Sequence, residues 1–179
     1  MKINMANRIT ILRIIIVPIF MAVLLSDMPN SKIIAAAIFI IAALSDKVDG
    51  YIARKYNQIT TFGKIFDPLA DKLLVCSAFV IFIDLGIMPA WMVFVIIARE
   101  FIVASLRTVA ADGGKIIAAS IWGKLKTVVQ FTGIIVFLLG VTPWEWVNPV
   151  INWAILITTL VSGIDYIIKN MDAFKLDNM

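Results

Sequence analysis

Histidine is absent from this 179-residue sequence, and cysteine occurs once, at Cys76. Without histidine the chain cannot build a Ser-His-Asp triad, a phosphohistidine intermediate or a zinc site with imidazole ligands. A single cysteine allows neither a disulfide nor a thiolate metal site within one chain. Any catalysis must therefore come from carboxylates, hydroxyls, lysine, arginine or metal ions held by oxygen.

Charged residues are also scarce. They make up 16% of the sequence and hydrophobic residues 61%, against about 25% and about 45–50% in ordinary globular domains. Long apolar runs recur at Ile33–Leu44, Leu73–Ile83, Met92–Ala98, Val128–Leu139 and Ile151–Val161. Because too little polar sequence remains to cover these runs in water, the composition predicts an all-α integral membrane protein.

Six membrane-spanning helices are predicted from the apolar runs and the residues that interrupt them. They are expected near 9–26, 32–53, 67–84, 89–108, 123–141 and 149–168. The first is interpreted as a retained span, because Arg13 and Pro18 interrupt it and no small-residue cleavage site follows Leu25. The connections are short and no internal repeat is found, so residues 1–179 are expected to form a single domain.

Lysine and arginine residues near the ends of these spans fall on one side of a six-span arrangement, and the other side holds Lys32 alone. The positive-inside rule then places both termini and the loops after the second and fourth spans in the cytoplasm. Trp144 and Trp146, together with Trp91, suit the aromatic belt of the opposite interface. We expect a multi-pass protein of the cell membrane.

The most informative stretch is acidic and joins the second expected span to the third. Asp46 and Asp49 are three residues apart and share a helix face, and Asp67 and Asp71 are four apart on the next helix. Antiparallel helices joined by a short loop would bring the two faces together.

Four carboxylates at membrane depth repel one another, and each costs about 2.5–3.5 kcal/mol on insertion scales. A divalent cation removes both penalties, and ligation by oxygen alone favours Mg²⁺ or Mn²⁺. Four carboxylates suffice to bridge two ions about 3.5–4 Å apart, as in enzymes of in-line displacement at phosphorus. The alternative is that these acids form surface pairs with neighbouring basic residues at solvated helix ends.

Two glycines and an arginine fit a phosphate-bearing ligand beside these acids. Gly50 removes a side chain from the acidic face, and Gly63 does so one turn before Asp67. Arg54 follows Gly50 by one turn and can reach a phosphate. Pro68 complicates the local geometry, because proline disfavours helix at Asp67, so the third helix is expected either to begin near Phe66 or to be kinked there.

The acidic stretch reads D-x-x-D-G-x-x-A-R, eight residues, then G-x-x-x-D-x-x-x-D, from Asp46 to Asp71. It matches the signature of the CDP-alcohol phosphotransferase family, which this chain resembles. Resemblance to the bacterial phosphatidylglycerophosphate synthase branch of that family rests on three further motifs. These are Asn7-x-x-Thr10-x-x-Arg13, Ala98-Arg99-Glu100, and Ala118-Ala119-Ser120-x-x-Gly123-Lys124-x-Lys126-Thr127-x-x-Gln130. The last expected span carries no motif that can be named.

The resemblance implies six transmembrane helices around a cytoplasm-facing polar cavity, in a homodimer. Asp46, Asp49, Asp67 and Asp71 would hold two Mg²⁺ or Mn²⁺ ions, and Asp71 would also take the proton of the acceptor hydroxyl. Contacts to the CDP-lipid would come from Gly50, Ala53, Arg54, Thr60 and Gly63, although Thr60 suits a helix N-cap equally well.

The implied reaction transfers the phosphatidyl group of CDP-diacylglycerol to glycerol 3-phosphate and releases CMP, without a covalent enzyme intermediate and without a nucleic acid partner. Arg99, Arg107, Lys124 and Lys126 are expected to bind the acceptor phosphate. Arg99 could instead pair with Glu100 or with an exposed acid of the cluster. Arg107 and the two lysines could reflect topology alone, because basic residues are expected at cytoplasmic helix ends. Lys124 and Lys126, two apart, cannot both face one cavity.

Other acceptors stay open, because the shared motif does not determine the alcohol: inositol phosphate, serine, or phosphatidylglycerol as in cardiolipin synthesis. A small ion transporter is a further alternative, since acids within membranes often line ion pathways. Against it, the acids crowd near one interface and no paired broken helices are predicted. A purely structural scaffold gives no reason for the four acids.

Overall fold

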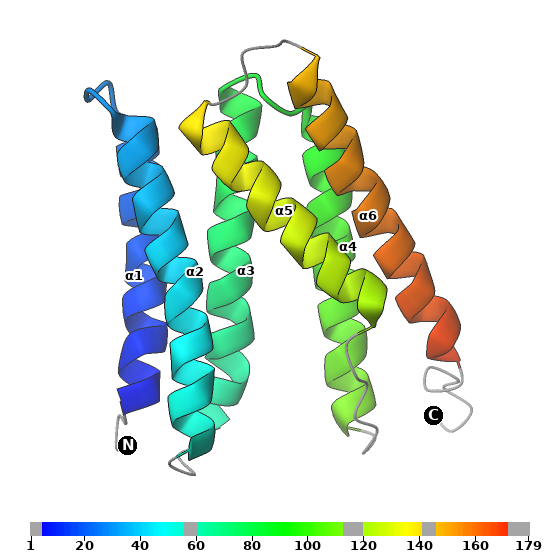
Figure 1. Ribbon diagram of the computed structural model, residues 1–179. Coiled ribbons are helices and arrows are strands. Elements are labelled where there is room, and N and C mark those ends of the chain that lie inside the picture. Colours follow the sequence, from blue (N-terminus) through cyan, green and yellow to red (C-terminus); the bar gives the residue numbers. More distant parts are fainter. Residues whose placement is uncertain (1–4, 56–60, 113–119, 141–145, 172–179) are drawn as a thin grey trace. The chain divides into compact units, whose positions relative to one another are not determined.

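The computed structural model describes residues 5–55, 61–112, 120–140 and 146–171. Within helices, the side chains at 5–9, 46–55, 61–65, 67–68, 71 and 111–112 lie outside this description. All regular structure in the described ranges is α-helical, as predicted (Figure 1). The helices are α1 (Met5–Leu24), α2 (Ser31–Lys55), α3 (Thr61–Asp84), α4 (Ala90–Asp112), α5 (Ile121–Leu139) and α6 (Val147–Lys169).

The helix bounds follow the predicted spans closely, except at the start of the third. Helix α3 begins at Thr61 and continues through Pro68, so a helix start near Phe66, one of the two expectations for this proline, is wrong. Proline removes one intrahelical hydrogen bond, and membrane helices tolerate that loss. Helix α1 likewise continues through Pro18.

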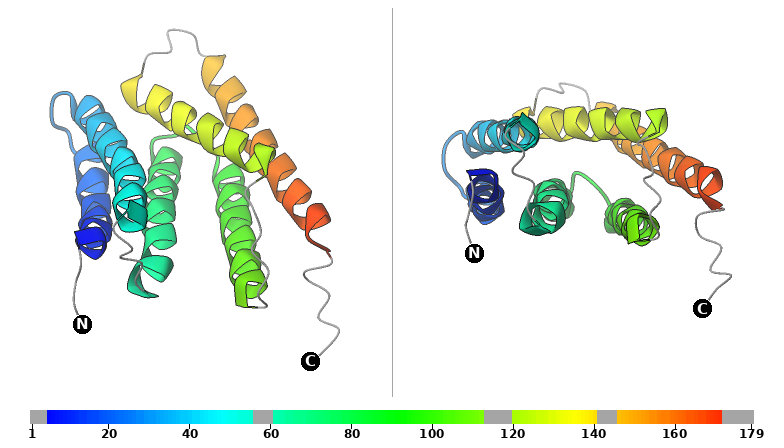
Figure 2. Two further views of the ribbon diagram at one scale, coloured as in Figure 1. Left: turned by 60° about the horizontal axis from the view of Figure 1, so that its bottom comes forward. Right: turned by 90° about the horizontal axis from the view of Figure 1, so that it is seen from below.

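The chain folds into two compact units, and unit 1 contains α1, α2 and α3. Helix α1 packs against both of the others, and the right-hand view of Figure 2 shows the three helices nearly end-on beside one another. The rings of Phe20 and Phe39, both fully buried, join α1 to α2 with their centroids 5.9 Å apart. Unit 1 thus contains the whole acidic motif, on α2 and α3.

The buried face of α1 is not wholly apolar. It follows helical spacing through Thr10, Arg13, Val17, Phe20 and Leu24. Arg13 is only 2% exposed, and a buried guanidinium is stable in a protein only when polar or charged groups surround it. The interior of unit 1 is therefore polar toward the N-terminal end of α1.

Unit 2 contains α4, α6 and α5 as far as Phe137. Helix α4 packs along α6, and Asn152 Nδ2 donates a hydrogen bond to the carbonyl oxygen of Ile87 at 2.8 Å. Helix α5 is held to α6 by a hydrogen bond from Gln130 Nε2 to Thr159 Oγ1 at 3.1 Å. Gly133 allows this close packing, because a Cβ there would lie 2.7 Å from Ile155 Cδ1.

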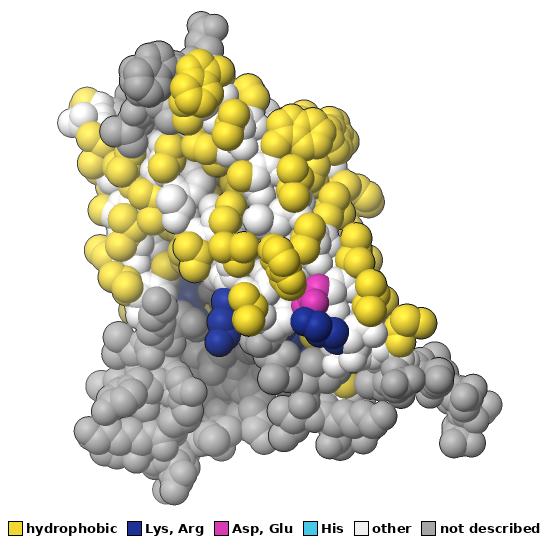
Figure 3. Space-filling view, turned by 45° about the vertical axis from the view of Figure 1, so that its right-hand side comes forward, with side chains coloured by type: hydrophobic (Ala, Val, Ile, Leu, Met, Phe, Trp, Pro, Cys, Tyr) yellow, Lys and Arg dark blue, Asp and Glu magenta, His cyan; other side chains and the backbone are white. Residues whose placement is uncertain are grey.

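Helices α5 and α6 are each long and apolar enough to cross a membrane. Large hydrophobic side chains are exposed on them and on the other helices, and Figure 3 shows apolar side chains over most of one face, with charged side chains along its lower part. Soluble proteins rarely expose an apolar surface of this extent to water. The protein is therefore membrane-associated.

Trp91 and Trp153 mark one end of unit 2. Their rings meet edge to face with centroids 6.1 Å apart, and both are exposed. Trp91 lies in the first turn of α4, and Trp153 lies in the second turn of α6. Exposed tryptophans of this kind suit a membrane interface.

Candidate functional site

The four aspartates predicted to bind metal lie on consecutive helices of unit 1. Asp46 and Asp49 belong to the C-terminal part of α2, and Asp67 and Asp71 to the N-terminal part of α3. The two helices contact each other, and only residues 56–60 separate them in the sequence. The aspartate side chains lie outside the described residues, so the metal site and the role of Asp71 as a base stay predictions.

The predicted contacts to the CDP-lipid also stay predictions. Gly50, Ala53 and Arg54 belong to α2 and Gly63 to α3, with side-chain positions outside the description, and Thr60 lies outside the described ranges altogether. Among the side chains that are described, no group of three or more carboxylates or thiols is placed to hold a metal ion.

A polar cluster formed by side chains of α4 and α5 lies in unit 2 and is only slightly exposed. Glu100 on α4 pairs with Lys126 on α5, and Arg99 Nη1 lies 3.4 Å from the same carboxylate oxygen. The side chains of Arg99 and Glu100 are each 12% exposed, and that of Lys126 is 8% exposed. Because two cations share one carboxylate, the cluster carries a net positive charge.

Arg99 is held mainly by α6. Its Nη2 donates a hydrogen bond to Ser162 Oγ at 2.5 Å. Its aliphatic stem lies against Gly163, where a Cβ would be 3.1 Å from Arg99 Cγ and 3.5 Å from Nε. The buried Nε has no hydrogen-bond partner among the described residues. A guanidinium has five N–H donors, and the contacts to Glu100 and Ser162 use one on each Nη group, so each Nη keeps an N–H for an anion.

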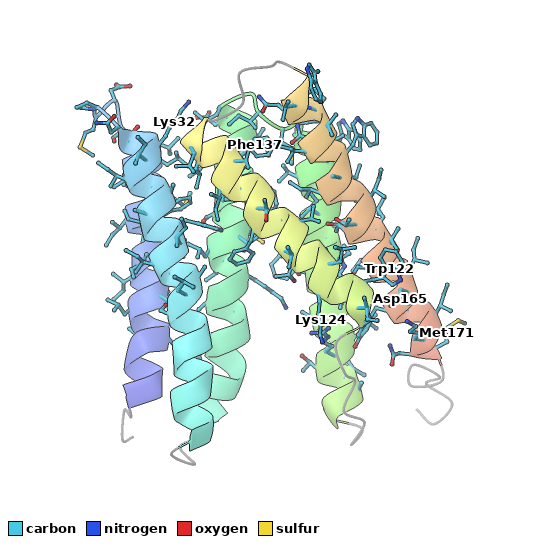
Figure 4. All side chains as sticks on the ribbon, viewed as in Figure 1. Lys32, Trp122, Lys124, Phe137, Asp165 and Met171 are labelled. Atoms are coloured by element: carbon cyan, nitrogen blue, oxygen red, sulfur yellow. The ribbon has the colours of Figure 1, made fainter. Side chains whose placement is uncertain are left out.

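The start of α5 lies beside this arginine. Ser120 caps the helix, since Ser120 Oγ accepts a hydrogen bond from the Gly123 N–H at 3.1 Å. A Cβ at Gly123 would lie 3.6 Å from Ser120 Oγ and 3.8 Å from Ser162 Oγ. Figure 4 shows Lys124, which is exposed, near this helix end together with Asp165. The positive end of the α5 dipole thus adds to the charge of the nearby cations.

Arg107 lies two turns after Arg99 on α4 and contacts α6 in a different way. Its guanidinium carbon is 5.3 Å from the centroid of the Tyr166 ring, in a cation–π arrangement. The Tyr166 ring is buried, and Arg107 is exposed. Asp165, next in the chain to Tyr166, accepts a hydrogen bond from Lys169 Nζ at 2.6 Å.

The four cationic residues predicted to bind the acceptor therefore fall into two groups that differ in solvent exposure. Arg99 and Lys126 are only 12% and 8% exposed and share Glu100, whereas Arg107 and Lys124 are exposed. The contact between Arg99 and Glu100, raised as an alternative from the sequence, is present alongside the shorter bond to Ser162. Lys124 and Lys126 differ in burial, as their spacing predicted.

Sequence reasoning missed the contribution of α6. Ser162 and Gly163 contact Arg99, yet the last expected span was left without a motif. A signal was present in the sequence, because adjacent small residues in a membrane helix mark places where another helix or side chain approaches closely.

Comparison with known proteins supports the sequence resemblance. The family model described as CDP-alcohol phosphatidyltransferase matches residues 3–163. The chain is 42% identical to the CDP-diacylglycerol–glycerol-3-phosphate 3-phosphatidyltransferase of Bacillus subtilis, over 98% of this chain and 99% of that protein. It is 37% identical to a probable phosphatidylglycerophosphate synthase of Mycobacterium tuberculosis (strain H37Rv), over 93% of this chain and 81% of that protein.

A further relative has the same name as the Bacillus subtilis protein and comes from a different bacterium. The CDP-diacylglycerol–glycerol-3-phosphate 3-phosphatidyltransferase of Rickettsia typhi is 33% identical, over 91% of this chain and 94% of that protein. The family match runs from the N-terminal residues into α6, so it covers both the acidic motif of unit 1 and the polar cluster of unit 2.

Proposed function

Because this chain belongs to the CDP-alcohol phosphatidyltransferase family, we propose that it transfers the phosphatidyl group from CDP-diacylglycerol to glycerol 3-phosphate, giving phosphatidylglycerophosphate and CMP. The proposal rests on one observation: the chain is 42% identical, over 98% of its length, to a bacterial enzyme named for this reaction. The protein is thus a membrane-associated transferase of phospholipid biosynthesis. Since the family match spans both compact units, we propose that residues 1–179 act as one domain.

The donor set of unit 1 fits a hard divalent cation. It consists of four carboxylates on two contacting helices, and the chain has no histidine to favour a softer metal. We propose that Asp46, Asp49, Asp67 and Asp71 hold two Mg²⁺ or Mn²⁺ ions. When bound, such ions supply positive charge that stabilises the negative charge developing on the diphosphate.

The protein's own side chains carry out the proton transfer and bind the nucleotide. Asp71 accepts the proton of the glycerol 3-phosphate hydroxyl, and the freed oxygen attacks the phosphorus that carries diacylglycerol. The bond from that phosphorus to the CMP oxygen breaks, and CMP leaves with the electron pair. Arg54 and Thr60 contact the nucleotide diphosphate, and Gly50, Ala53 and Gly63 leave room for it. No covalent intermediate with the enzyme forms.

The acceptor phosphate is assigned to the cations of unit 2, Arg99, Arg107, Lys124 and Lys126. A phosphate monoester carries close to two negative charges at neutral pH, and the buried Arg99–Glu100–Lys126 cluster retains one positive charge. The planar guanidinium of Arg99 matches two phosphate oxygens at once. A neutral alcohol such as serine has no phosphate to match these cations.

The proposal includes six membrane-crossing helices, a cytoplasm-facing polar cavity, cytoplasmic termini and a homodimer. The helices have between 19 and 25 residues. At 1.5 Å per residue, even the shortest is about 28 Å long, close to the ~30 Å of bilayer hydrocarbon. The basic residues at one side of the predicted spans support the orientation.

CMP release by the purified protein tests the function directly. CDP-diacylglycerol is offered with glycerol 3-phosphate, inositol phosphate, serine or phosphatidylglycerol in turn, and Arg99→Ala is assayed beside the wild type. We expect turnover with glycerol 3-phosphate and a raised KM for it in the variant. Preference for another acceptor would overturn the assignment, and an absence of CMP release with every acceptor would favour the ion-transporter alternative.

A further inference from the structure

Helix α6 has no part in the function proposed so far, yet it holds the most buried of the acceptor-binding arginines. We propose that Ser162 and Gly163 are positioning residues, which fix the orientation in which Arg99 presents its guanidinium to the acceptor phosphate. This inference rests on the proposed function and adds to it a role for the last helix.

Ser162 fixes the guanidinium end of Arg99. Its Oγ accepts a 2.5 Å hydrogen bond from Nη2, whereas Nη1 lies at the longer distance of 3.4 Å from Glu100 Oε1. Ser162 is itself buried, which limits competition by water for its hydroxyl. The short bond to α6 thus restrains the guanidinium from the side opposite the more distant carboxylate of Glu100.

Gly163 fixes the aliphatic stem of the same side chain. A Cβ at this position would come within 3.1 Å of Arg99 Cγ and 3.5 Å of Nε, so any larger residue must push the stem away from α6. With Nε buried against Gly163, an anion has access to Arg99 through the Nη groups alone. The path of the stem therefore decides where the phosphate is bound.

The Lys126–Glu100 pair completes the support from the other side. Glu100 faces Lys126 as well as Arg99, so its negative charge is shared between the two cations. Three helices thus restrict a side chain that is otherwise long and flexible. Pre-organisation of this kind strengthens ligand binding because less freedom is lost when the ligand arrives.

The test compares Ser162→Ala and Gly163→Ala with the wild type in steady-state assays of CMP release. We expect Ser162→Ala to raise the KM for glycerol 3-phosphate about tenfold, the factor that corresponds to one lost hydrogen bond to a charged group. Gly163→Ala should raise it as well, because the displaced stem carries the guanidinium away from its position against α6. The kcat and the KM for CDP-diacylglycerol should stay within about twofold of wild type. Thr158→Ala is the matched control, because its hydroxyl, as far as the described residues show, bonds to the backbone of α6 alone.

A second readout separates positioning from a merely structural effect. In an Arg99→Ala background, adding Ser162→Ala should change the KM for glycerol 3-phosphate no further, because the serine acts through the arginine. An additional rise in that background, or an unchanged KM in both single variants, would overturn the positioning role while leaving the proposed function intact. A wild-type protein inactive with glycerol 3-phosphate would overturn the proposed function, and this inference with it.

Discussion

Lys126 of α5 and Glu100 of α4 form an ion pair in the interior of unit 2, and Arg99 contacts the same carboxylate. Among the side chains that the structure describes, Glu100 is thus the carboxylate that both cations share. Removing it would leave both cations buried without their shared counter-charge, whereas removing Lys126 would still leave Glu100 facing Arg99. The two residues of the pair are therefore not equivalent for stability.

Substitution of these two residues should reveal this asymmetry. We expect Glu100→Leu to lower the free energy of unfolding by about 3–5 kcal/mol, the cost of breaking a buried pair from one side. Lys126→Met should cost less, and the double variant should recover part of the loss. Thermal unfolding of the detergent-solubilised protein measures all three. A greater loss for Lys126→Met than for Glu100→Leu would contradict the shared-carboxylate arrangement.

Removal of divalent metal should abolish turnover and lower the melting temperature. Without cations, the four carboxylates on α2 and α3 repel one another in an environment that solvates charge poorly. Excess EDTA is the treatment, and addition of Mg²⁺ or Mn²⁺ should restore both CMP release and the melting temperature. Full turnover in excess EDTA would refute the metal site.

Asp71→Asn should reduce kcat by about 10²–10⁴-fold, the usual contribution of a general base, while much of the binding of the CDP-lipid is kept. Arg54 and Gly50 are unchanged in this variant. CMP release gives kcat, and competition by a non-reactive CDP-lipid analogue gives binding. Asp84→Asn is the control, because it makes the same change at the exposed far end of α3. Near-normal turnover in Asp71→Asn would sink the assigned role.

Gly133→Ala should destabilise the packing of α5 on α6. The new Cβ would lie 2.7 Å from Ile155 Cδ1 and 3.0 Å from Ile151 Cγ2, and overpacking of this kind costs about 1–3 kcal/mol. Gly123→Ala is the control on the same helix, since its Cβ would meet its neighbours at ordinary contact distances of 3.6 and 3.8 Å. Thermal unfolding compares them, and equal melting temperatures would count against the close approach.

Single cysteines test the proposed orientation of the chain in a Cys76→Ala background. In intact cells, cysteines at Asn57 and Gly114 should be shielded from an impermeant thiol reagent, because both follow predicted cytoplasmic span ends. A cysteine at Asn148, at the start of α6, should be labelled. Permeabilised cells provide the control for reactivity. Labelling at Asn57 in intact cells would overturn the orientation.

The helices were predictable because hydrophobic runs and their breakers are local properties of the chain. The fourth predicted span, 89–108, corresponds to α4 (Ala90–Asp112), and the sixth, 149–168, corresponds to α6 (Val147–Lys169). The start of the third helix was predicted too late because of Pro68. Proline disfavours helix at the residue before it, but the long helix α3 continues through this position.

The partners of the charged residues were less predictable, because periodicity gives the face of a helix but not the helix opposite. Nothing local indicates that Lys126 meets Glu100 across a gap in sequence, or that Arg99 binds Ser162. The acidic motif differs from these charged residues, because its spacing is specific enough to identify the family. The positions of its side chains cannot be predicted from that spacing.

The exposed Trp153 and the terminal Lys169 of α6 also bear on the kind of bilayer that suits the protein. The rise along the helix between them is about 24 Å, somewhat less than the ~30 Å of an average hydrocarbon layer. Tryptophan rests at the headgroup level, and lysine extends its charged end toward it. Each ångström of mismatch costs a fraction of a kcal/mol. For α6 as the proposed membrane span, shorter acyl chains would therefore fit with less deformation of the bilayer.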